Sequence, residues 1–415
     1  MGSLPDALSR LYARIPLGMR LGLEPMRRAC ARAGHPEGAF PTVHVAGTNG
    51  KGSVCAMVEA IARADGRKTG LYTSPHLCRF AERIRIDGDP IDDALLTSLL
   101  GRALDAGPDL SFFETATLAA FFAFQDARVD LAVLEVGMGG RLDATNVIPP
   151  PRAAAITRIA LDHTDRLGTT LVEIAREKAG IAKAGIDIVV GTVTPAVREA
   201  IDQVARAQRA TTSRATEDAP ADVGLPGEHQ RENARVAATL GVRIGASPDA
   251  VSRGIATARW PGRLERIGDF LLDAAHNPDG ADALAQHLRS LKLAPDGIAL
   301  VFGTLADKDW PPMLDTLAPL AGTRIYLAPA RASRSAVDPR AMAERHEGHI
   351  ASSIDEALAI LARFGVNPSP PAPGGPSPAP PASGRPLVVV AGSLVLVGQV
   401  RGRLLGLRCD PAVAL

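Results

Sequence analysis

The residue types and spacing best suited to chemistry lie in residues 42–54, Thr-Val-His-Val-Ala-Gly-Thr-Asn-Gly-Lys-Gly-Ser-Val. Val43–Ala46 predicts a short buried strand, the glycines that follow predict a tight turn, and Ser53–Ala64 predicts a helix. Glycines allow successive backbone N–H groups to face one anion, the helix N-terminus adds its dipole, and Lys51 adds a mobile positive charge. This stretch therefore predicts a site for the polyphosphate of a nucleotide.

The stretch departs from the general P-loop pattern, which has Gly five residues before the Gly-Lys pair and Ser or Thr directly after it. Val45 and Gly52 occupy those positions. A glycine-rich turn with one solvated lysine is the alternative interpretation, but few such turns carry lysine in this register. The narrower form Gly-Thr-Asn-Gly-Lys-Gly-Ser resembles the phosphate loop of the Mur ligase superfamily of ATP-dependent amide-bond-forming enzymes.

Three polar residues follow three separate predicted strands. Ser74 ends the strand within Lys68–Leu77, Glu135 lies near the end of Val129–Val136, and His163 follows the strand Ala153–Ile159. Each residue alone is also compatible with a structural role. Because the carboxyl ends of parallel strands meet at one edge of a sheet, the three side chains can gather beside Lys51. Together they offer oxygen and imidazole ligands to a divalent ion that bridges ATP phosphates.

Two predicted helices carry further candidates. Phe112–Phe124 is strongly apolar, with Ser111 as its cap and Glu114 three residues on, and its aromatic side chains are expected in the core. Thr169–Lys183 carries Lys178, which by itself predicts a solvated surface charge because lysine is rarely buried.

Composition limits the class of protein. The 415 residues, 46% of them hydrophobic, are enough for two domains, and a net charge of +1 gives no reason to expect a nucleic-acid or membrane partner. Four scattered cysteines indicate neither a zinc site nor a disulfide framework. The chain shows no signal peptide and no apolar run long enough for a membrane span. We expect a cytoplasmic monomer.

The pattern changes near Trp260, where a second series of alternating strands and helices begins. We expect an N-terminal ATP-binding domain over residues 1–257 and a smaller C-terminal α/β domain over residues 258–415. The proline-rich stretch 367–386 predicts a flexible loop within the second domain. The predicted fold class is therefore α/β, with a mainly parallel sheet in a P-loop domain followed by a Rossmann-like domain.

From about Leu21 to the C-terminus the chain resembles the folylpolyglutamate synthases, many of which in bacteria also act as dihydrofolate synthases. The resemblance rests on ordered motifs: Gly47-Thr-Asn-Gly-Lys-Gly-Ser53, Thr73-Ser-Pro-His-Leu77, Phe113-Glu114, Glu135-Val-Gly-Met-Gly-Gly-Arg-Leu-Asp-Ala-Thr-Asn146, Leu161-Asp-His163, Glu177-Lys-Ala-Gly-Ile181, His229-Gln-Arg-Glu-Asn-Ala234, Trp260-Pro-Gly-Arg263, Asp273-Ala-Ala-His-Asn-Pro278 and Gly392-Ser-Leu394.

The resemblance implies site residues by position. The ATP-binding positions are Gly47, Thr48, Asn49, Gly50, Lys51, Gly52, Ser53, Asn233, Arg263 and Asp273. The magnesium ligands are Ser74, Glu135 and His163. The positions that hold dihydropteroate in bifunctional relatives are Ser111, Phe112, Phe113, Glu114, Leu142, Asp143 and Ala144. Lys178 matches a lysine that relatives carry as a carbamate, and its surface alternative is then set aside; His276 either stabilises the transferred phosphoryl group or only closes its Asn-Pro turn.

The implied activity is the ligation of L-glutamate to dihydropteroate and to reduced folates, with ATP, Mg2+ and an acyl-phosphate intermediate. Two departures leave the number of activities open: Arg20 stands where some bifunctional members have an acid, and the proline-rich insertion is additional. The alternatives are a folylpolyglutamate synthase without the first activity, a peptidoglycan-precursor ligase, a P-loop switch or small-molecule kinase, and a non-enzymatic nucleotide-binding module.

Overall fold

A computed structural model describes residues 3–15, 22–329, 335–366 and 385–410. Arg20 and residues 367–384 of the proline-rich stretch therefore lie outside the described residues. The chain divides into two compact units. Unit 1 comprises Met1–Ser74, Ala81–Gly224 and Gln230–Arg259, and unit 2 comprises Pro75–Phe80, Leu225–His229 and Trp260–Leu415. Among the described helices, none is long and apolar enough to cross a membrane.

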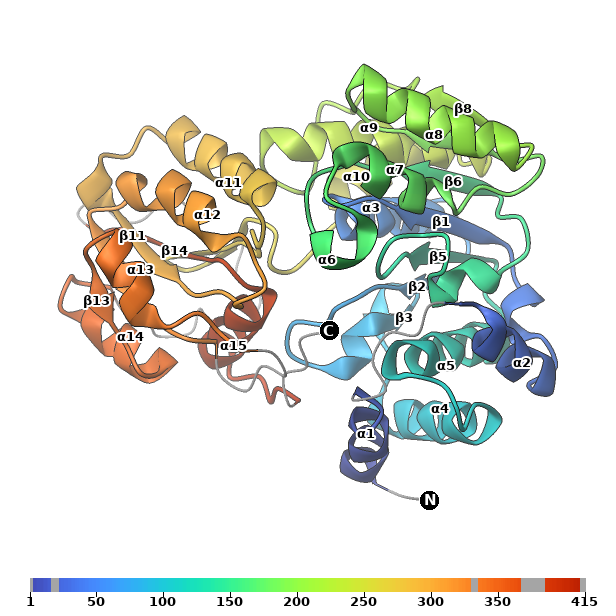
Figure 1. Ribbon diagram of the computed structural model, residues 1–415, viewed down its shortest axis with the longest axis horizontal. Coiled ribbons are helices and arrows are strands. Elements are labelled where there is room, and N and C mark those ends of the chain that lie inside the picture. Colours follow the sequence, from blue (N-terminus) through green and yellow to red (C-terminus); the bar gives the residue numbers. More distant parts are fainter. Residues whose placement is uncertain (1–2, 16–21, 330–334, 367–384, 411–415) are drawn as a thin grey trace. The chain divides into compact units, whose positions relative to one another are not determined.

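Unit 1 is built on an eight-stranded sheet in the order β4-β3-β2-β5-β1-β6-β7-β8 (Figure 1). Its strands are β1 Thr42–Ala46, β2 Thr69–Tyr72, β3 Ile84–Ile86, β4 Asp89–Pro90, β5 Leu131–Glu135, β6 Ala153–Ile156, β7 Asp187–Val190 and β8 Thr211–Arg214. Each strand pairs in parallel with the next along the series β2-β5-β1-β6-β7-β8. The β2–β3 and β3–β4 pairs are antiparallel. Strand β1 is therefore central, with β5 on one side and β6 on the other.

The helices of unit 1 start where the sequence offers caps. They are α1 Leu4–Tyr12, α2 Glu24–Arg32, α3 Lys51–Ala64, α4 Asp93–Ala106, α5 Phe112–Ala127, α6 Thr164–Leu167, α7 Leu171–Ala179, α8 Pro195–Ala207, α9 Glu228–Arg243 and α10 Pro248–Thr257. Ser111 and Glu114 form the predicted capping box of α5, and Thr170 with Glu173 forms another at α7. These caps satisfy backbone N–H groups that would otherwise lack partners at the helix start.

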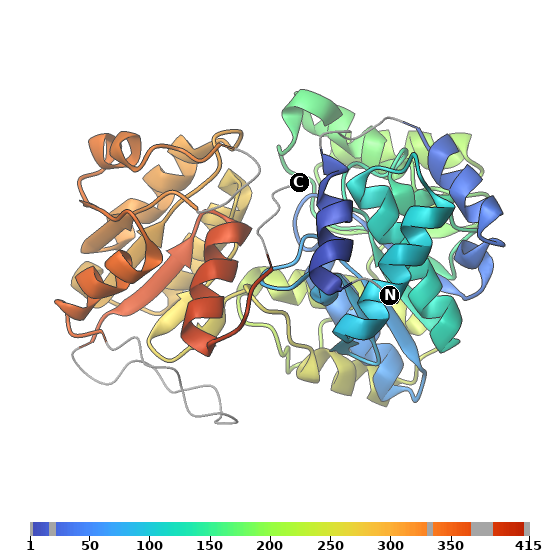
Figure 2. The same cartoon turned by 90° about the horizontal axis from the view of Figure 1, so that it is seen from below.

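Unit 2 contains a six-stranded sheet in the order β13-β12-β11-β14-β10-β9. Its strands are β9 Glu265–Ile267, β10 Phe270–Leu272, β11 Ile298–Phe302, β12 Thr323–Tyr326, β13 His349–Ile350 and β14 Leu387–Ala391, and its helices are α11 Pro278–Ser290, α12 Trp310–Leu317, α13 Pro339–Arg345, α14 Ile354–Ala362 and α15 Leu394–Leu405. Among the strands that the structure describes in this sheet, only β9 runs antiparallel to its neighbour. Figure 2 shows α15 alongside β14.

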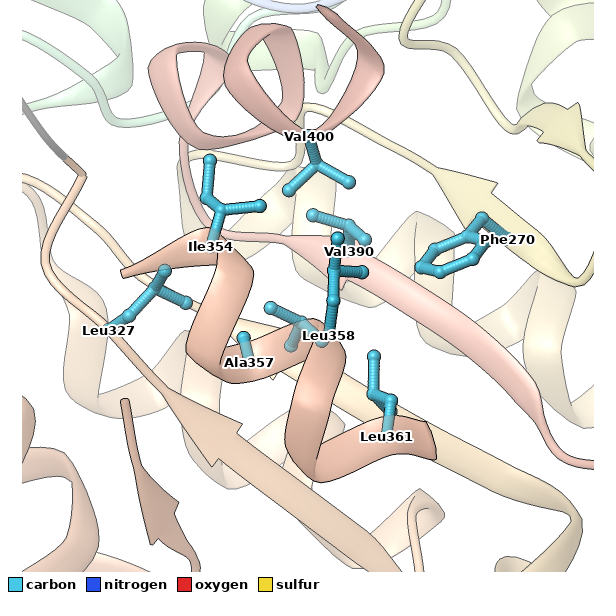
Figure 3. Close-up of a pocket in the computed structure, with 9 residues that line it drawn as sticks. Phe270, Leu327, Ile354, Ala357, Leu358, Leu361, Val390 and Val400 are labelled. Carbon is cyan, nitrogen blue, oxygen red and sulfur yellow. The ribbon is translucent and has the colours of Figure 1, made fainter. Parts of the chain in front are cut away.

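Alternate residues of the unit 2 strands build two cores, one on each face of the sheet. Leu300, Phe302 and Val389 pack with residues of α11, α12 and α13. Val301 and Val390 pack with residues of α14 and α15. The second core encloses a small cavity beneath α14, and all nine residues that line it are apolar (Figure 3). This cavity is a packing gap, because it offers no polar group to a ligand.

Two features of unit 1 differ from the sequence-based prediction. Strand β8, Thr-Thr-Ser-Arg, lies in a stretch where the sequence shows only a weak pattern; it is an edge strand, and none of its residues is fully buried. Strand β6 ends at Ile156, three residues before the predicted end at Ile159. The residues after Ile156 leave the sheet because they hydrogen-bond to the glycine-rich loop that follows β1.

Close packing of α10 on α3 gives a prediction about stability. A Cβ atom added at Gly254 would lie 2.4 Å from both the Cα and the backbone N of Ile61, so Gly254→Ala must push the two helices apart. We expect this variant to lower the free energy of unfolding by about 1–3 kcal/mol. Gly101→Ala is the matched control, since no atom of the described residues, apart from its chain neighbours and its own helix backbone, lies within 4 Å of its added Cβ. The control should raise the free energy of unfolding by roughly 0.4–1 kcal/mol. Denaturant unfolding measures both, and equal effects would contradict the packing argument.

Candidate active site

Four adjacent strands of unit 1 each deliver one candidate residue at their carboxyl ends. In the order β2, β5, β1 and β6, these are Ser74, Glu135, Lys51 and His163. Parallel pairing of β2 with β5, β5 with β1 and β1 with β6 brings all four ends to the same edge of the sheet. In open α/β sheets this edge is where ligands bind.

The phosphate-loop candidate joins β1 directly to α3, which begins at Lys51. Gly50 caps α3 with φ 88°, and a Cβ there would lie 2.4 Å from the Asn233 side-chain oxygen. Only glycine fits both conditions. Asn233 on α9 donates to Gln230 (2.9 Å), which in turn donates to the Ser53 hydroxyl (3.2 Å). The predicted ATP-binding residue Asn233 therefore lies against the loop.

Segment 157–160 holds the loop in place. Thr48 donates its backbone N–H to the Arg158 carbonyl (2.8 Å) and its hydroxyl to the Ala160 carbonyl (3.1 Å). Thr157 donates its hydroxyl to the Asn49 carbonyl at 2.7 Å. Lys51 donates to the Thr48 carbonyl at 3.1 Å, so its ammonium group lies over its own loop.

The metal-ligand candidates are half-buried or buried. Glu135 is 6% exposed, and one carboxylate oxygen accepts the backbone N–H of Ser74 at 3.2 Å. His163 caps the short helix α6 with φ 51°, and its Nε2 atom lies 3.9 Å from Asp162 Oδ2. No group of three or more His, Cys, Asp or Glu side chains in the described ranges is arranged to hold a metal ion. An ion at this edge would therefore need further oxygen ligands, such as those of a polyphosphate.

Lys178 is buried, in contrast to the surface position that its helix alone predicts. It is 4% exposed, and within the described chain its amine makes no hydrogen bond or ion pair. Burial, followed by the charge of Lys51, lowers the pKa of Lys178 from 10.5 to about 7, against smaller opposing effects of Asp162 and Asp143. A substantial share of this amine is therefore neutral near pH 7.

The second glycine-rich loop, residues 137–143, is closed by Asp143. This carboxylate is 5% exposed and accepts the backbone N–H groups of Met138 and Thr145, each at 3.0 Å. Burial raises the pKa of Asp143, although these hydrogen bonds oppose the rise. Asp143 also caps the 3-10 helix Ala144–Val147. Its position between the loop and that helix makes it a rigid acceptor.

Helix α5 brings aromatic residues to the same loop. The half-buried Phe113 lies against Gly137, where an added Cβ would be 2.4 Å from the ring, and its centroid is 6.1 Å from that of Tyr72. Phe112 is buried and stacks on Tyr12. Ser111 and Glu114 bond to each other in the capping box, so their polar groups serve the helix. Leu142 is half-buried and Ala144 is buried.

Unit 2 gathers its own polar group around Asp273, which follows β10. The two Asp273 oxygens accept the backbone N–H groups of Leu264 and Ala275, each at 2.9 Å. His276 bonds through Nδ1 to the Ala274 carbonyl at 2.9 Å, which directs its Nε2 atom away from that carbonyl. Half-buried Arg263 donates to the Gly262 carbonyl at 3.1 Å.

Three neighbours of these sites are not among the site residues predicted from the sequence, although His229 and Asp162 stand within the quoted motifs. Burial lowers the pKa of His229. The charge of Asp273 raises this pKa and the charge of Arg263 lowers it. The charge of Asp162 raises the pKa of Lys178, and the Thr157 hydroxyl donates a hydrogen bond to the glycine-rich loop. Each of these residues lies far along the chain from its partner, so no spacing rule would have found it.

Comparison with known proteins places the chain in a family. The Mur ligase middle domain model matches residues 45–219, and the model for the Mur ligase glutamate ligase domain matches residues 262–368. The folylpolyglutamate synthase of Lacticaseibacillus casei is 35% identical over 420 residues, covering 90% of this chain and 92% of that protein. The dihydrofolate synthase/folylpolyglutamate synthase of Mycobacterium tuberculosis is 37% identical over 436 residues, covering 89% and 87%.

The chain belongs to the folylpolyglutamate synthase family. A probable bifunctional folylpolyglutamate synthase/dihydropteroate synthase of Haloferax volcanii is 34% identical over 438 residues, and the chain spans 50% of that longer protein. The resemblance predicted from the motifs is thus confirmed.

Solved structures of the folylpolyglutamate synthase family share the fold. The M. tuberculosis folylpolyglutamate synthase complexed with ADP superposes with a TM-score of 0.83 at 32% identity, covering 99% of both chains. E. coli FolC in complex with DHPP and ADP gives 0.82 at 31%, covering 96% of this chain and 97% of that one. A bifunctional relative with Mn, AMPPNP and L-glutamate bound gives 0.82 at 30%, covering 97% and 98%. The predicted fold class is confirmed.

The lowered pKa of Lys178 predicts how stability depends on pH in this folylpolyglutamate synthase relative. Between about pH 7 and 10.5 the unfolded chain holds a proton on Lys178 that the folded chain has lost. The free energy of unfolding should therefore rise with pH in this window, by up to about 1.4 kcal/mol per pH unit from this group, and the contribution should be flat below it. Urea unfolding in carbonate-free buffer measures the slope.

Lys178→Met should remove this contribution to the slope. Lys68→Met, which removes an exposed lysine, is the control and should leave the slope as in wild type. An unchanged slope in Lys178→Met would contradict the lowered pKa.

Proposed function

We propose that the chain is an ATP-dependent carboxylate–amine ligase that adds L-glutamate to dihydropteroate and to reduced folates. Residues 1–257 bind ATP and the pteroate in this proposal, and residues 258–415 form the glutamate ligase domain. The observation that carries it is the alignment of Ser74, Glu135, Lys51 and His163 on four adjacent strand ends. Relatives with ADP, with DHPP and ADP, and with Mn, AMPPNP and L-glutamate support it.

Phosphoryl transfer comes first in this reaction. The backbone N–H groups of the glycine-rich loop and the ammonium of Lys51 bind the ATP phosphates and stabilise the charge that develops on the transferred group. The substrate carboxylate attacks the γ-phosphorus, ADP leaves, and an acyl phosphate forms. The amine of glutamate then attacks the acyl carbon and releases phosphate, so no protein nucleophile is needed.

The residues present fit a divalent ion, which we propose is Mg2+. Glu135 supplies a buried carboxylate and Ser74 a hydroxyl, both hard oxygen donors, and His163 adds an imidazole. Bound there with the polyphosphate, the ion would neutralise charge on the transferred phosphoryl group. The role of Glu135 in orienting Ser74 follows from their hydrogen bond at 3.2 Å.

We assign Lys178 as a carbamate. Its buried amine, with a pKa lowered to about 7, is neutral often enough to add CO2. The nitrogen bonds to the CO2 carbon and loses a proton to solvent, so the product is an anion. The carbamate would replace the repulsion between the lysines at 178 and 51 by attraction. It would also supply oxygen atoms to the ion's surroundings.

We assign the pteroate ring to the space between α5 and the second glycine-rich loop. Phe113 and Tyr72 present aromatic faces there, with ring centroids 6.1 Å apart. Asp143 offers carboxylate oxygens to the amino and ring N–H groups of a pterin. Of the matched positions, Ser111, Phe112, Glu114, Leu142 and Ala144 shape the surrounding wall.

The nucleotide and phosphoryl roles of unit 2 are assigned to three residues. Arg263 and Asp273 contact the nucleotide in this proposal, and His276 stabilises the transferred phosphoryl group through Nε2, since Nδ1 is held by the Ala274 carbonyl. Asn233 in unit 1 contacts the adenine. We propose that the active enzyme is a monomer.

One experiment tests the proposed function directly. Purified protein is incubated with ATP, Mg2+ and glutamate, together with dihydropteroate or with a reduced folate, and the products are identified by mass. We expect one added glutamate residue per ADP formed with each acceptor. A gain only with the folate would leave a folylpolyglutamate synthase alone. ADP formation that needs neither acceptor nor glutamate would favour the switch or kinase alternative.

Lys51→Ala should abolish ligation, because it removes a positive charge from the transferred phosphoryl group, at a cost of several kcal/mol in the transition state. Circular dichroism should show a folded protein, and Lys68→Ala, at an exposed lysine, is the control with unchanged turnover. Wild-type turnover in folded Lys51→Ala would exclude the phosphate-loop assignment.

Asp143→Ala should separate the two activities. Dihydropteroate carries only a bare benzoate carboxylate, so its ring system must be held firmly, whereas a folate with glutamate attached reaches the phosphate from a longer tail. Loss of a charged hydrogen-bond acceptor costs about 1.5–3 kcal/mol, roughly ten- to a hundredfold in dihydropteroate ligation. Steady-state kinetics with both acceptors measures the difference, and an equal loss of both activities would count against this assignment.

A further inference from the structure

A buried hydrogen-bonded chain joins the central strand to the second glycine-rich loop. His44 on β1 is 0% exposed, and its Nε2 atom lies 2.8 Å from the Thr145 hydroxyl oxygen. The Thr145 hydroxyl donates to Asp143 Oδ1 at 2.5 Å. The three residues come from two segments of the sequence: His44 precedes Thr145 by 101 positions, and Asp143 is two positions before Thr145. The sequence motifs gave no role to His44 or Thr145.

The positions of the hydrogens in this chain follow from what each atom can do. An ionised carboxylate only accepts, so the single hydroxyl hydrogen of Thr145 points to Asp143. The Thr145 oxygen must then accept from His44, which requires a hydrogen on His44 Nε2. Backbone N–H groups of Met138 and Thr145 also converge on Asp143, and they oppose the rise in its pKa that burial causes.

The surroundings of His44 are consistent with this tautomer. Within the described residues its buried Nδ1 atom has no hydrogen-bond partner, whereas Nε2 has one, so a hydrogen on Nε2 is shared and one on Nδ1 would not be. Burial, together with the charge of Lys183, lowers the pKa of His44 to about 3, so the ring is neutral at physiological pH. Lys183 donates to the Asn146 carbonyl (2.9 Å) and side-chain oxygen (3.0 Å), so it ties down the residue that follows Thr145.

We propose that His44 is a positioning residue for the pteroate substrate: its Nε2–H orients the Thr145 hydroxyl, which fixes the Asp143 carboxylate that closes the loop against Phe113. The strand that leads into the phosphate loop thereby also sets the acceptor that meets the substrate ring. His44 need not touch the substrate to act. The inference rests on the proposed function, in which this loop and Phe113 receive the pteroate.

Kinetics of paired variants test this role. His44→Leu and Thr145→Val each remove a link of the hydrogen-bonded chain. Each should raise KM for the pteroate acceptor about tenfold, while KM for ATP stays within about twofold. The double variant should show no larger effect than either single one, because both remove the same interaction. His44→Gln keeps an N–H donor near the Nε2 position and Thr145→Ser keeps the hydroxyl, so both should restore most of the affinity.

Val43→Ala is the matched control, because it truncates a buried side chain of the same strand outside the hydrogen-bonded chain. It should lower stability without a selective change in KM for the acceptor. Additive effects of the two single variants, or a loss of ATP affinity equal to the loss for the acceptor, would reduce His44 to a structural residue and overturn the proposal.

A spectroscopic measurement decides the tautomer without any activity. In protein labelled with 15N at its nine histidines, the His44 signals are those lost in His44→Gln or, if that variant does not fold, those shifted in Thr145→Ser. We expect a protonated Nε2 and a bare Nδ1, unchanged from about pH 5 to about pH 8. A proton on Nδ1 would overturn the proposal. If wild type ligates neither acceptor, the proposed function fails, whereas this measurement still decides the hydrogen-bonded chain.

Discussion

The burial of the Lys178 amine within the electrostatic field of Lys51 is the constraint on which the candidate site depends. Burial of the Lys178 amine, followed by repulsion from the half-buried Lys51, opposes its charged form, and the lowered pKa of Lys178 expresses that cost. The carboxylates of Asp143 and Asp162 oppose this lowering of the Lys178 pKa. A bound anion would act in the same direction as these carboxylates.

The parallel sheet of unit 1 makes this arrangement possible. Its central strand β1 pairs with β5 and β6, so the residues that follow these strands share one edge. The phosphate loop does not hold its shape alone, because its carbonyl and N–H groups bond to segment 157–160. The same strand carries His44 toward the second loop. Strand β1 thus connects the glycine-rich loop that follows it with the second glycine-rich loop.

Unit 2 also places a polar residue directly after a strand of its sheet. Asp273 follows β10 and accepts two backbone N–H groups, which hold its carboxylate and the turn that leads to His276. Buried polar groups here are oriented by backbone atoms, so their directions are set by the fold of the turn. The apolar cavity beneath α14 belongs to the core of this unit and offers no polar contact to a substrate.

The sequence by itself determined the glycine-rich turn between β1 and α3, the strands β1 and β5, the capping box of α5 and the family, because these depend on local patterns and short motifs. It did not predict β8, whose four residues at the sheet edge bury too little to leave a hydrophobic pattern. For Lys178 the helix pattern alone indicated the surface, and only the motif around it suggested otherwise. Only the tertiary structure decided that this amine is buried within reach of the Lys51 charge and that the His44 ring hydrogen-bonds to Thr145. Burial and long-range hydrogen bonds arise when distant segments pack together, and no spacing within one segment records them.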